Sequence, residues 1–258
     1  MSIVKTNGAS IYYEVHGEGP AIVFAHGAGG NAASWWRQVP YFARNHKVVV
    51  FDHRIFGRST CALEDFDQSR YADDLFAILD AEGIDRAVIV CQSMGGRTGL
   101  RAALDAPERV RCLILSNTAG GIDRESFRSH SAAARKKFAG ESFGVVALAQ
   151  DYRNRHPDLY YLYTHINGLN AAVTPQVRER MNDPRASINE SRLEGFATPT
   201  LCITSPHDVL FPPAVIREVA GLIPGAELIE LPGAGHSPYF EMPDAFNETV
   251  AAFVNKQP

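Results

Sequence analysis

Apolar residues along this chain gather in short continuous runs, and stretches with helical spacing separate one run from the next. A strand inside a parallel sheet is buried on both faces, so it typically appears as a continuous apolar run. The segment SIYYEVHG alternates instead, which predicts an early antiparallel strand. Strands and helices in alternation predict an α/β protein with a doubly wound sheet. The predicted parallel strands are 21–27, 47–53, 87–92, 111–117, 200–205 and 226–231, and the predicted helices are 69–83, 93–108 and 213–225.

Residues 119–197 interrupt this alternation. They contain no convincing strand, and three of their segments have the composition of short helices separated by Gly, Pro and Asn: SAAARKKFAG, FGVVALAQDYRNRH and TPQVRERMND. We therefore predict that residues 119–197 form a helical cap. The cap would pack over a core made of residues 1–118 and 198–258.

The segment VIVCQSMGGRTG places Ser93 directly after a predicted buried strand and before a predicted helix. A sharp turn there would hold the serine backbone in a strained conformation and expose its hydroxyl at the carboxyl edge of the sheet. Gly95 and Gly96 supply the small neighbours that such a turn requires. The usual pattern is G-x-S-x-G, and Cys91 stands where the first glycine is expected. The alternative is that Ser93 only caps the following helix.

A nucleophilic serine needs a histidine base and an acid that orients the histidine. In LPGAGHSPYFEMPDAFN, His236 follows the last predicted strand, and in CITSPHDVLFPP, Asp208 follows the strand before it. Taken alone, His236 could be an ordinary surface histidine, and Asp208 could be a turn residue beside proline. The chain order Ser93, Asp208, His236 is that of a serine-hydrolase triad, so together the three residues favour catalysis.

Such a triad also needs an oxyanion hole built from backbone N–H groups. The segment FAHGAGG comes at the end of the first predicted parallel strand, and its glycines allow the backbone to approach a substrate closely. We assign the N–H groups of Ala28 and Met94 as the donors. The segment lacks the Lys-Ser/Thr ending of a phosphate-binding loop and does not match the G-x-G-x-x-G dinucleotide pattern. We therefore expect no nucleotide cofactor.

With these motifs in this order, the sequence resembles the α/β-hydrolase superfamily, in particular its small capped branch of carboxylesterases, enol-lactonases, C–C bond hydrolases and cofactor-free haloperoxidases. The resemblance covers almost the whole chain and is carried by HGAGG, FDHRIFGRS, CQSMGG, SPHDVLFPP and GAGHSPYFEMP. It implies a mostly parallel eight-stranded sheet flanked by helices, with the cap inserted after strand 6. It also implies Ser93 as nucleophile, His236 as general base and Asp208 as the orienting carboxylate, with no cofactor and no metal.

Several positions leave alternatives open. Cys91 and Ile55 stand where the family commonly has glycine. Cys91 is disfavoured as a nucleophile, because its side chain should point into the strand–helix packing. Asp123 is the next candidate acid if Asp208 is not the one. Arg97 is more often a helix residue paired with a nearby acid, but it could instead be a cation positioned at the site.

We predict a hydrolase that cleaves a carboxylic ester or lactone of a small, largely apolar substrate through an acyl-enzyme. The alternatives are a C–C bond hydrolase acting on a vinylogous diketone, and a ligand receptor or slow-turnover binding protein on the same scaffold. Aromatic residues in the predicted cap suggest the apolar substrate. Tyr160, Tyr161 and Tyr163 lie close together in DLYYLYTHINGL, where they more often fill a cap core than line a pocket.

Composition limits the partners and the cellular location that we expect for this protein. The 258 residues include 25 Lys and Arg and 29 Asp and Glu, a net charge of −4, and no basic block suggests nucleic acid as a partner. No stretch approaches the ~20 apolar residues that cross a bilayer, and we recognise no secretory signal. The 4 cysteines are not at metal-ligand spacing. We expect a soluble cytoplasmic protein that acts on a small molecule, does not bind membranes and is compatible with a homo-oligomer.

Overall fold

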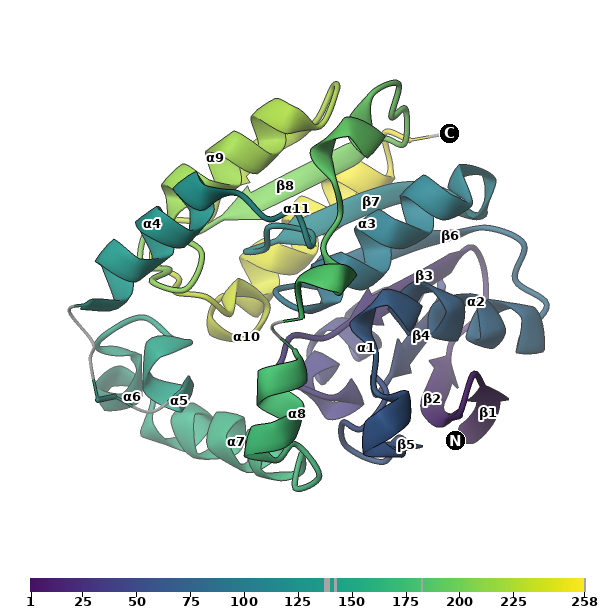
Figure 1. The fold of residues 1–258 in the computed structure, drawn as a ribbon, viewed down its shortest axis with the longest axis horizontal. Coiled ribbons are helices and arrows are strands. Elements are labelled where there is room, and N and C mark those ends of the chain that lie inside the picture. Colours follow the sequence, from purple (N-terminus) through teal and green to yellow (C-terminus); the bar gives the residue numbers. More distant parts are fainter. Residues whose placement is uncertain (137–139, 142, 182, 258) are drawn as a thin grey trace.

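A mixed β-sheet forms the centre of the molecule, in a computed structural model that describes residues 1–136, 140–141, 143–181 and 183–257 (Figure 1). Eight strands form its continuous path, and a short ninth strand, β5 (Thr60–Cys61), pairs with β2. In spatial order the eight strands are β1 (Ser2–Thr6), β2 (Ala9–His16), β4 (Lys47–Phe51), β3 (Ala21–Ala25), β6 (Ala87–Gln92), β7 (Val110–Ser116), β8 (Thr200–Thr204) and β9 (Glu227–Glu230).

The directions of the strands confirm the predicted fold class. Strand β2 pairs antiparallel with both β1 and β4, whereas every pair from β4 to β9 is parallel. All six residues of β6 are buried, as a continuous apolar run predicts for the middle of a parallel sheet. The sequence analysis missed β1 and β5, because β1 is a largely exposed edge strand and β5 has only two residues.

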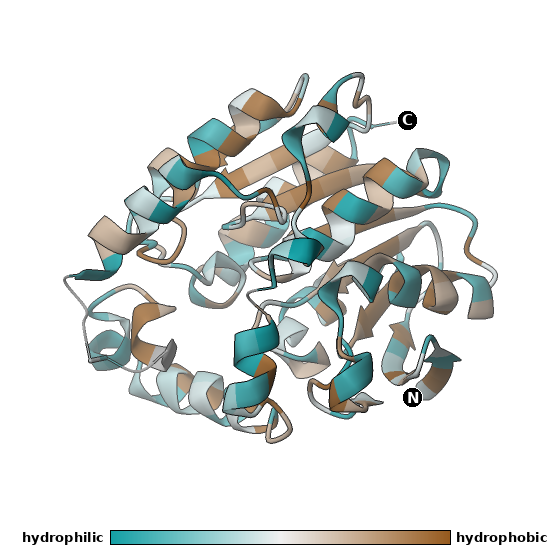
Figure 2. Ribbon diagram, viewed as in Figure 1, coloured by the Kyte–Doolittle hydropathy of each residue, from teal (hydrophilic) through white to brown (hydrophobic). Residues whose placement is uncertain are grey.

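Helices cover both faces of the sheet. On one face, Leu75, Leu100 and Ile216 bring α2 (Tyr71–Ala81), α3 (Gly95–Asp105) and α9 (Pro213–Leu222) into one apolar core with the strands. On the other face, Phe42 of α1 (Gln38–Phe42) and Phe246 of α11 (Pro243–Val254) pack with Phe24 of β3. Figure 2 shows hydrophobic colouring along the strands, while the helices alternate in colour around their circumference. Amphipathic helices on an apolar sheet are the expected result of this sequence pattern.

The inserted segment is helical: α4 lies beside α9, while α5, α6 and α7 lie together (Figure 1). Its only described β-structure is an isolated bridge between Ile122 and Ile188. The helix predicted at 131–140 ends earlier than expected, and residues 137–139 lie outside the described part. The helix predicted at 143–156 is two shorter helices. The division of the chain into a core and a cap stays a prediction. The helices are α4 (Glu125–Arg135), α5 (Phe143–Val146), α6 (Tyr152–Arg155), α7 (Pro157–Gly168) and α8 (Pro175–Arg180).

The remaining short elements connect these parts. Helix α10 (Pro238–Glu241) precedes α11, and 3-10 helices span Ala32–Trp35, Leu63–Asp65, Gln68–Arg70, Pro107–Arg109, Pro184–Ala186 and Glu190–Leu193. None of the helices in the described part of the chain is both long and apolar enough to span a membrane.

The clustered tyrosines of α7 mostly serve packing. Tyr163 is buried, and Tyr160 packs partly buried against the same core cluster as Phe246. Tyr161 is 64% exposed on the opposite side of the helix. The interpretation that these residues fill a core is therefore right for two of the three.

Candidate active site

Ser93 lies in the turn between β6 and α3 and has a left-handed backbone with φ 52°. Its N–H donates to the Ser116 carbonyl at 3.1 Å, and its own carbonyl accepts from Thr118 Oγ1 at 2.5 Å. A non-glycine residue in this conformation costs about 1–2 kcal/mol, which the surrounding hydrogen bonds must offset. Met94 is the N-cap residue of α3, and among the described residues no side-chain hydrogen bond caps the helix, so Ser93 does not have the capping role considered as the alternative.

Small residues let β6 and α3 approach closely at this turn. A Cβ atom on Gly95 would lie 2.2 Å from the Ala25 carbonyl oxygen, and one on Gly99 would lie 2.3 Å from Cys91 Sγ. The Cys91 side chain therefore points at α3, as expected, and is fully buried. Burial raises the pKa of its thiol, which disfavours the thiolate that a cysteine nucleophile requires.

His236 and Asp208 come together in the loops that follow β9 and β8. Nδ1 of His236 lies 2.9 Å from Oδ2 of Asp208, and both side chains are buried. The other carboxylate oxygen, Oδ1, accepts from the backbone N–H groups of Leu210 and Phe211 at 2.8 and 2.9 Å. Asp208 is therefore both a turn residue and the partner of the histidine. Because the ionised carboxylate can only accept, His236 donates from Nδ1 and leaves a lone pair on Nε2.

Nε2 of His236 is buried and has no hydrogen-bond partner among the described residues, so it is not hydrogen-bonded to Ser93. The two side chains share a neighbour, Phe211. Phe211 stacks on the His236 ring, with 5.8 Å between ring centroids, and it lines the same pocket as Ser93. Catalytic hydrogen bonds often tighten only when substrate binds, so the pairing of Ser93 with His236 stays a prediction.

Two polar residues that the sequence analysis did not single out hold this pair in place. Asn117 donates from Nδ2 to Asp208 Oδ2 at 2.9 Å, from a left-handed backbone with φ 50°. Gln92 donates from Nε2 to the His236 carbonyl at 2.8 Å. Gln92 is the last residue of β6, and Asn117 directly follows β7, so both lie at the carboxyl edge of the sheet. A polar residue at the end of a predicted buried strand was the sequence signal that could have identified them.

The segment that contains Ala28 packs directly against the turn at Ser93. A Cβ on Gly27 would lie 2.1 Å from Gln92 Oε1 and 3.0 Å from Ser93 Cβ. Met94 lines the pocket, and Ala28 packs against the apolar cluster that includes Met94. Within the described residues, neither the Ala28 nor the Met94 backbone N–H has a hydrogen-bond acceptor. Both are therefore available to an incoming group.

Ile55, which replaces a glycine usual in the family, has φ 70°. A β-branched residue in the left-handed region is strained. Its side chain is nevertheless only 7% exposed and packs in a cluster with Met94 of the site and Val177 of α8. Ile55 thereby adds an apolar contact between the loop after β4, the inserted helices and the residue that follows Ser93.

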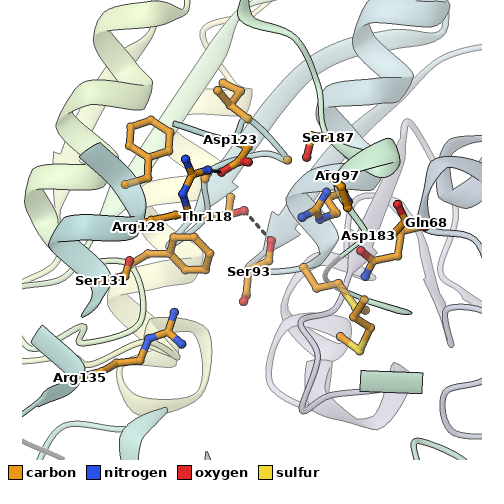
Figure 3. A pocket seen from close by; sticks show the side chains of 18 residues that line it. Gln68, Ser93, Arg97, Thr118, Asp123, Arg128, Ser131, Arg135, Asp183 and Ser187 are labelled. Atoms are coloured by element: carbon orange, nitrogen blue, oxygen red, sulfur yellow. Dashed lines mark hydrogen bonds and ion pairs between the residues drawn. The ribbon is translucent and has the colours of Figure 1, made fainter. Parts of the chain in front are cut away.

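The pocket beside Ser93 has a volume of about 410 Å³ and is formed by the sheet edge and the inserted segment (Figure 3). Its volume is within the range of small-molecule sites. None of the α7 tyrosines lines it. Within the described part of the chain, no group of three or more His, Cys, Asp or Glu side chains could hold a metal ion. The lining residues are Gln68, Ser93, Met94, Arg97, Thr118, Ala119, Gly121, Ile122, Asp123, Phe127, Arg128, Ser131, Arg135, Met181, Asp183, Pro184, Ser187 and Phe211.

Two candidates from the sequence differ from expectation here. Arg97 does not pair with an acid: among the described residues it forms no ion pair, and it donates to the Ala186 carbonyl at 3.2 Å. The favoured interpretation of Arg97 was therefore wrong, because the two carboxylates of the same pocket, Asp123 and Asp183, pair with other arginines. Asp123 is bonded to Arg128 and forms no hydrogen bond to His236, so it does not have the geometry of the triad acid.

Comparisons with known proteins agree with this fold. The family model described as the alpha/beta hydrolase fold matches residues 20–140. A solved structure described as Est816, an N-acyl homoserine lactone degrading enzyme, is 30% identical, with a TM-score of 0.81 over 98% of this chain and 100% of that one. The chain belongs to the α/β-hydrolase superfamily.

Other relatives of this α/β-hydrolase carry different activities in their names. A protein of Azorhizobium caulinodans named "Putative carbamate hydrolase RutD" is 29% identical over 266 residues, which cover 98% of each chain. The enol-lactonase from Burkholderia xenovorans LB400 is 26% identical, with a TM-score of 0.81 over 98% of this chain and 100% of that one. These likenesses support hydrolase activity and leave the bond that is cleaved to be argued from the site.

Proposed function

We propose that this hydrolase cleaves a carboxylic ester or lactone through an acyl-enzyme on Ser93. The observation that carries the proposal is the buried His236–Asp208 pair, whose Nε2 is unpartnered within the described residues, beside a left-handed serine that lines a pocket. The names of two similar structures, one that degrades an acyl homoserine lactone and one an enol-lactonase, support the same bond type.

In the proposed reaction, Ser93 Oγ attacks the substrate carbonyl carbon while His236 Nε2 takes the hydroxyl proton. Asp208 holds the imidazole in the tautomer that can accept this proton and stabilises the imidazolium that forms. The negative charge that develops on the carbonyl oxygen is stabilised by the N–H groups of Ala28 and Met94. His236 then gives its proton to the leaving oxygen, and the acyl group remains on Ser93.

Water completes the cycle by the reverse sequence of proton transfers. His236 takes a proton from water, hydroxide attacks the acyl-enzyme, and the carboxylic acid is released as Ser93 recovers its proton. A lactone would give one ring-opened product, because its leaving oxygen and its acyl carbon belong to the same molecule.

One observation favours a second candidate, hydrolysis of a C–C bond in a vinylogous diketone. That reaction uses the same triad but begins with a ketonisation, and a positioned cation would assist it. The Arg97 guanidinium lines the pocket with no carboxylate partner among the described residues. A ligand receptor or slow-turnover binding protein on this scaffold would form an acyl-enzyme but hydrolyse it slowly or not at all.

The first experiment is pre-steady-state hydrolysis of 4-nitrophenyl acetate by the wild type and by Ser93→Ala. We expect a burst of one nitrophenolate per enzyme, followed by turnover, and the loss of both in Ser93→Ala. The matched control is Ser187→Ala, which removes another hydroxyl from the same pocket and should keep the burst.

Each other outcome has a distinct meaning. Turnover by a well-folded Ser93→Ala would refute Ser93 as the nucleophile. A burst without turnover would favour the receptor. An absence of any burst, together with hydrolysis of a vinylogous diketone, would favour the C–C hydrolase.

A further inference from the structure

The pocket beside Ser93 carries more charge than an apolar substrate requires. Three arginines and two aspartates line it: Arg97, Arg128, Arg135, Asp123 and Asp183. Of the aromatic residues in the predicted cap, Phe127 lines the pocket, whereas the α7 tyrosines pack in the core or face outward. The pocket lining therefore indicates a substrate that carries a charged group beside its apolar part.

Both aspartates of the pocket are already neutralised by other arginines. Asp123 is bonded to Arg128, and Asp183 accepts from Arg185 Nε at 2.9 Å. Among the described residues these pairs leave one half-buried cation in the pocket wall, Arg97, without an ion-pair partner. Arg135 also has no ion-pair partner in the part of the chain that the structure describes, but it is exposed at the end of α4.

The environment of Arg97 is unusual for this protein. The fully buried Arg54 is held by Asp74 through two hydrogen bonds, from Nε at 2.8 Å and from Nη2 at 2.5 Å. Arg97 has only the Ala186 carbonyl, although a guanidinium carries five N–H donors. Burial lowers the pKa of Arg97, against the opposing effect of Asp123 in the same pocket. A half-buried guanidinium whose donors are largely unused by the protein can bind an anion.

The position of Arg97 connects this anion site with the reacting serine. Arg97 is four residues after Ser93, in the first turn of α3, and both line one cavity of about 410 Å³. In Figure 3 the Arg97 guanidinium points into the pocket on the side of Ser93. One small molecule can therefore contact both residues at once.

We propose that Arg97 binds a carboxylate of the substrate, so that the natural substrate is an ester or lactone that also carries a free carboxylate. This inference rests on the proposed function, since it names the substrate class of the same site. A planar guanidinium binds a carboxylate through two parallel N–H···O bonds, which would orient the scissile carbonyl toward Ser93.

The test compares two esters of equal length, monoethyl succinate and ethyl butyrate, which differ by a carboxylate in place of a terminal methyl group. We expect the wild type to prefer the succinate in kcat/KM, and Arg97→Gln to lose that preference by about 10–100-fold, mainly through KM. Arg97→Lys should lie between them, because it keeps the charge but loses the planar fork.

Arg101→Gln is the matched control. Arg101 donates to the same Ala186 carbonyl, at 3.1 Å, but does not line the pocket, so its loss should leave the preference unchanged. If Arg101→Gln lowers the preference as much as Arg97→Gln does, the effect comes from the Ala186 segment and the proposal is wrong. It is equally wrong if the wild type shows no preference.

A binding measurement separates this proposal from the proposed function. Calorimetry with monoethyl succinate on Ser93→Ala, with and without Arg97→Gln, detects the carboxylate site without turnover. Binding that depends on Arg97, in a wild type that hydrolyses no ester, would support the carboxylate site and refute ester hydrolysis. Hydrolysis of both esters at equal rates, with no binding that depends on Arg97, would support ester hydrolysis and refute the carboxylate site.

Discussion

At the scale of single residues, the candidate site depends on hydrogen-bond direction. Asp208 Oδ2 accepts from two donors, His236 Nδ1 and Asn117 Nδ2, each at 2.9 Å. An acceptor-only carboxylate satisfies both donors and fixes the imidazole tautomer. Asn117 is a positioning residue in this arrangement, because it acts through Asp208.

Replacing this carboxylate by an amide tests the assignment. In Asp208→Asn, the side chain keeps one oxygen for the turn N–H groups but turns an NH₂ toward two donors. We expect the folded variant to lose about 10⁴-fold in kcat for 4-nitrophenyl acetate, because the histidine adopts the wrong tautomer. Asp123→Asn is the control and should change kcat by less than about 10-fold, as Asp123 forms no hydrogen bond to His236. The reverse ranking would make Asp123 the acid.

At the scale of elements, the strand–turn–helix unit from β6 to α3 depends on glycine where two backbones meet. A Cβ on Gly99 would lie 2.3 Å from Cys91 Sγ and 2.7 Å from Leu113 Cδ1. Cys91, in place of the usual glycine, therefore fills the space beside Gly99. The close approach of α3 to β6 and β7 sets where the helix begins, and so where Ser93 lies.

Two glycine-to-alanine changes in helices distinguish close packing from helix propensity. Gly99→Ala should lower the free energy of unfolding by about 1–3 kcal/mol, because the added methyl group overpacks the core. Gly221→Ala, in α9, meets nothing within 4 Å and should raise it by a few tenths to about 1 kcal/mol. Urea unfolding measures both. Equal changes in unfolding free energy for the two variants would show that the contact of Gly99 with Cys91 does not restrict the size of the side chain at position 99.

At the scale of the whole molecule, Glu241 joins the histidine loop to the inserted segment. Oε1 accepts from the N–H groups of Gly235 and Ser237, on either side of His236, at 2.9 and 3.2 Å. Oε2 accepts from the Ala149 N–H of the insertion at 2.7 Å. Burial raises the pKa of Glu241 to about 7, against the opposing effect of these three hydrogen bonds. The Glu241 carboxyl group therefore connects the loop of His236 to the insertion, and its protonation state changes near pH 7.

This coupling predicts how stability depends on pH. The folded state binds a proton at Glu241 up to about pH 7, whereas the unfolded chain releases it near pH 4.5, so its contribution to stability falls as pH rises between them. The difference in unfolding free energy, wild type minus Glu241→Gln, should decrease by about 2–3 kcal/mol from pH 5 to pH 8. Urea unfolding at several pH values measures it. A difference that stays constant with pH would place the pKa of Glu241 in its ordinary range.

The sequence alone determined the sheet and the chain order of the candidate triad. Continuous apolar runs require burial on both faces, and this requirement predicted β3, β4, β6, β7 and β8 and the polar residues that follow them. Parallel strands place their carboxyl ends at one edge, so Ser93, Asp208 and His236 could be expected near one another before any coordinates were known.

Only the tertiary structure decided what surrounds these residues. Helical periodicity shows that a side chain faces another element but does not identify the element, so Tyr163 and Arg97 could not be assigned to core or pocket from sequence. Asn117, Glu241 and the pairing of Asp123 with Arg128 depend on contacts between segments far apart in the chain or on local side-chain directions. The proposed preference for a carboxylate substrate also depends on the fold. Arg97 is left without an ion-pair partner among the described residues only because the fold pairs Asp123 and Asp183 with other arginines.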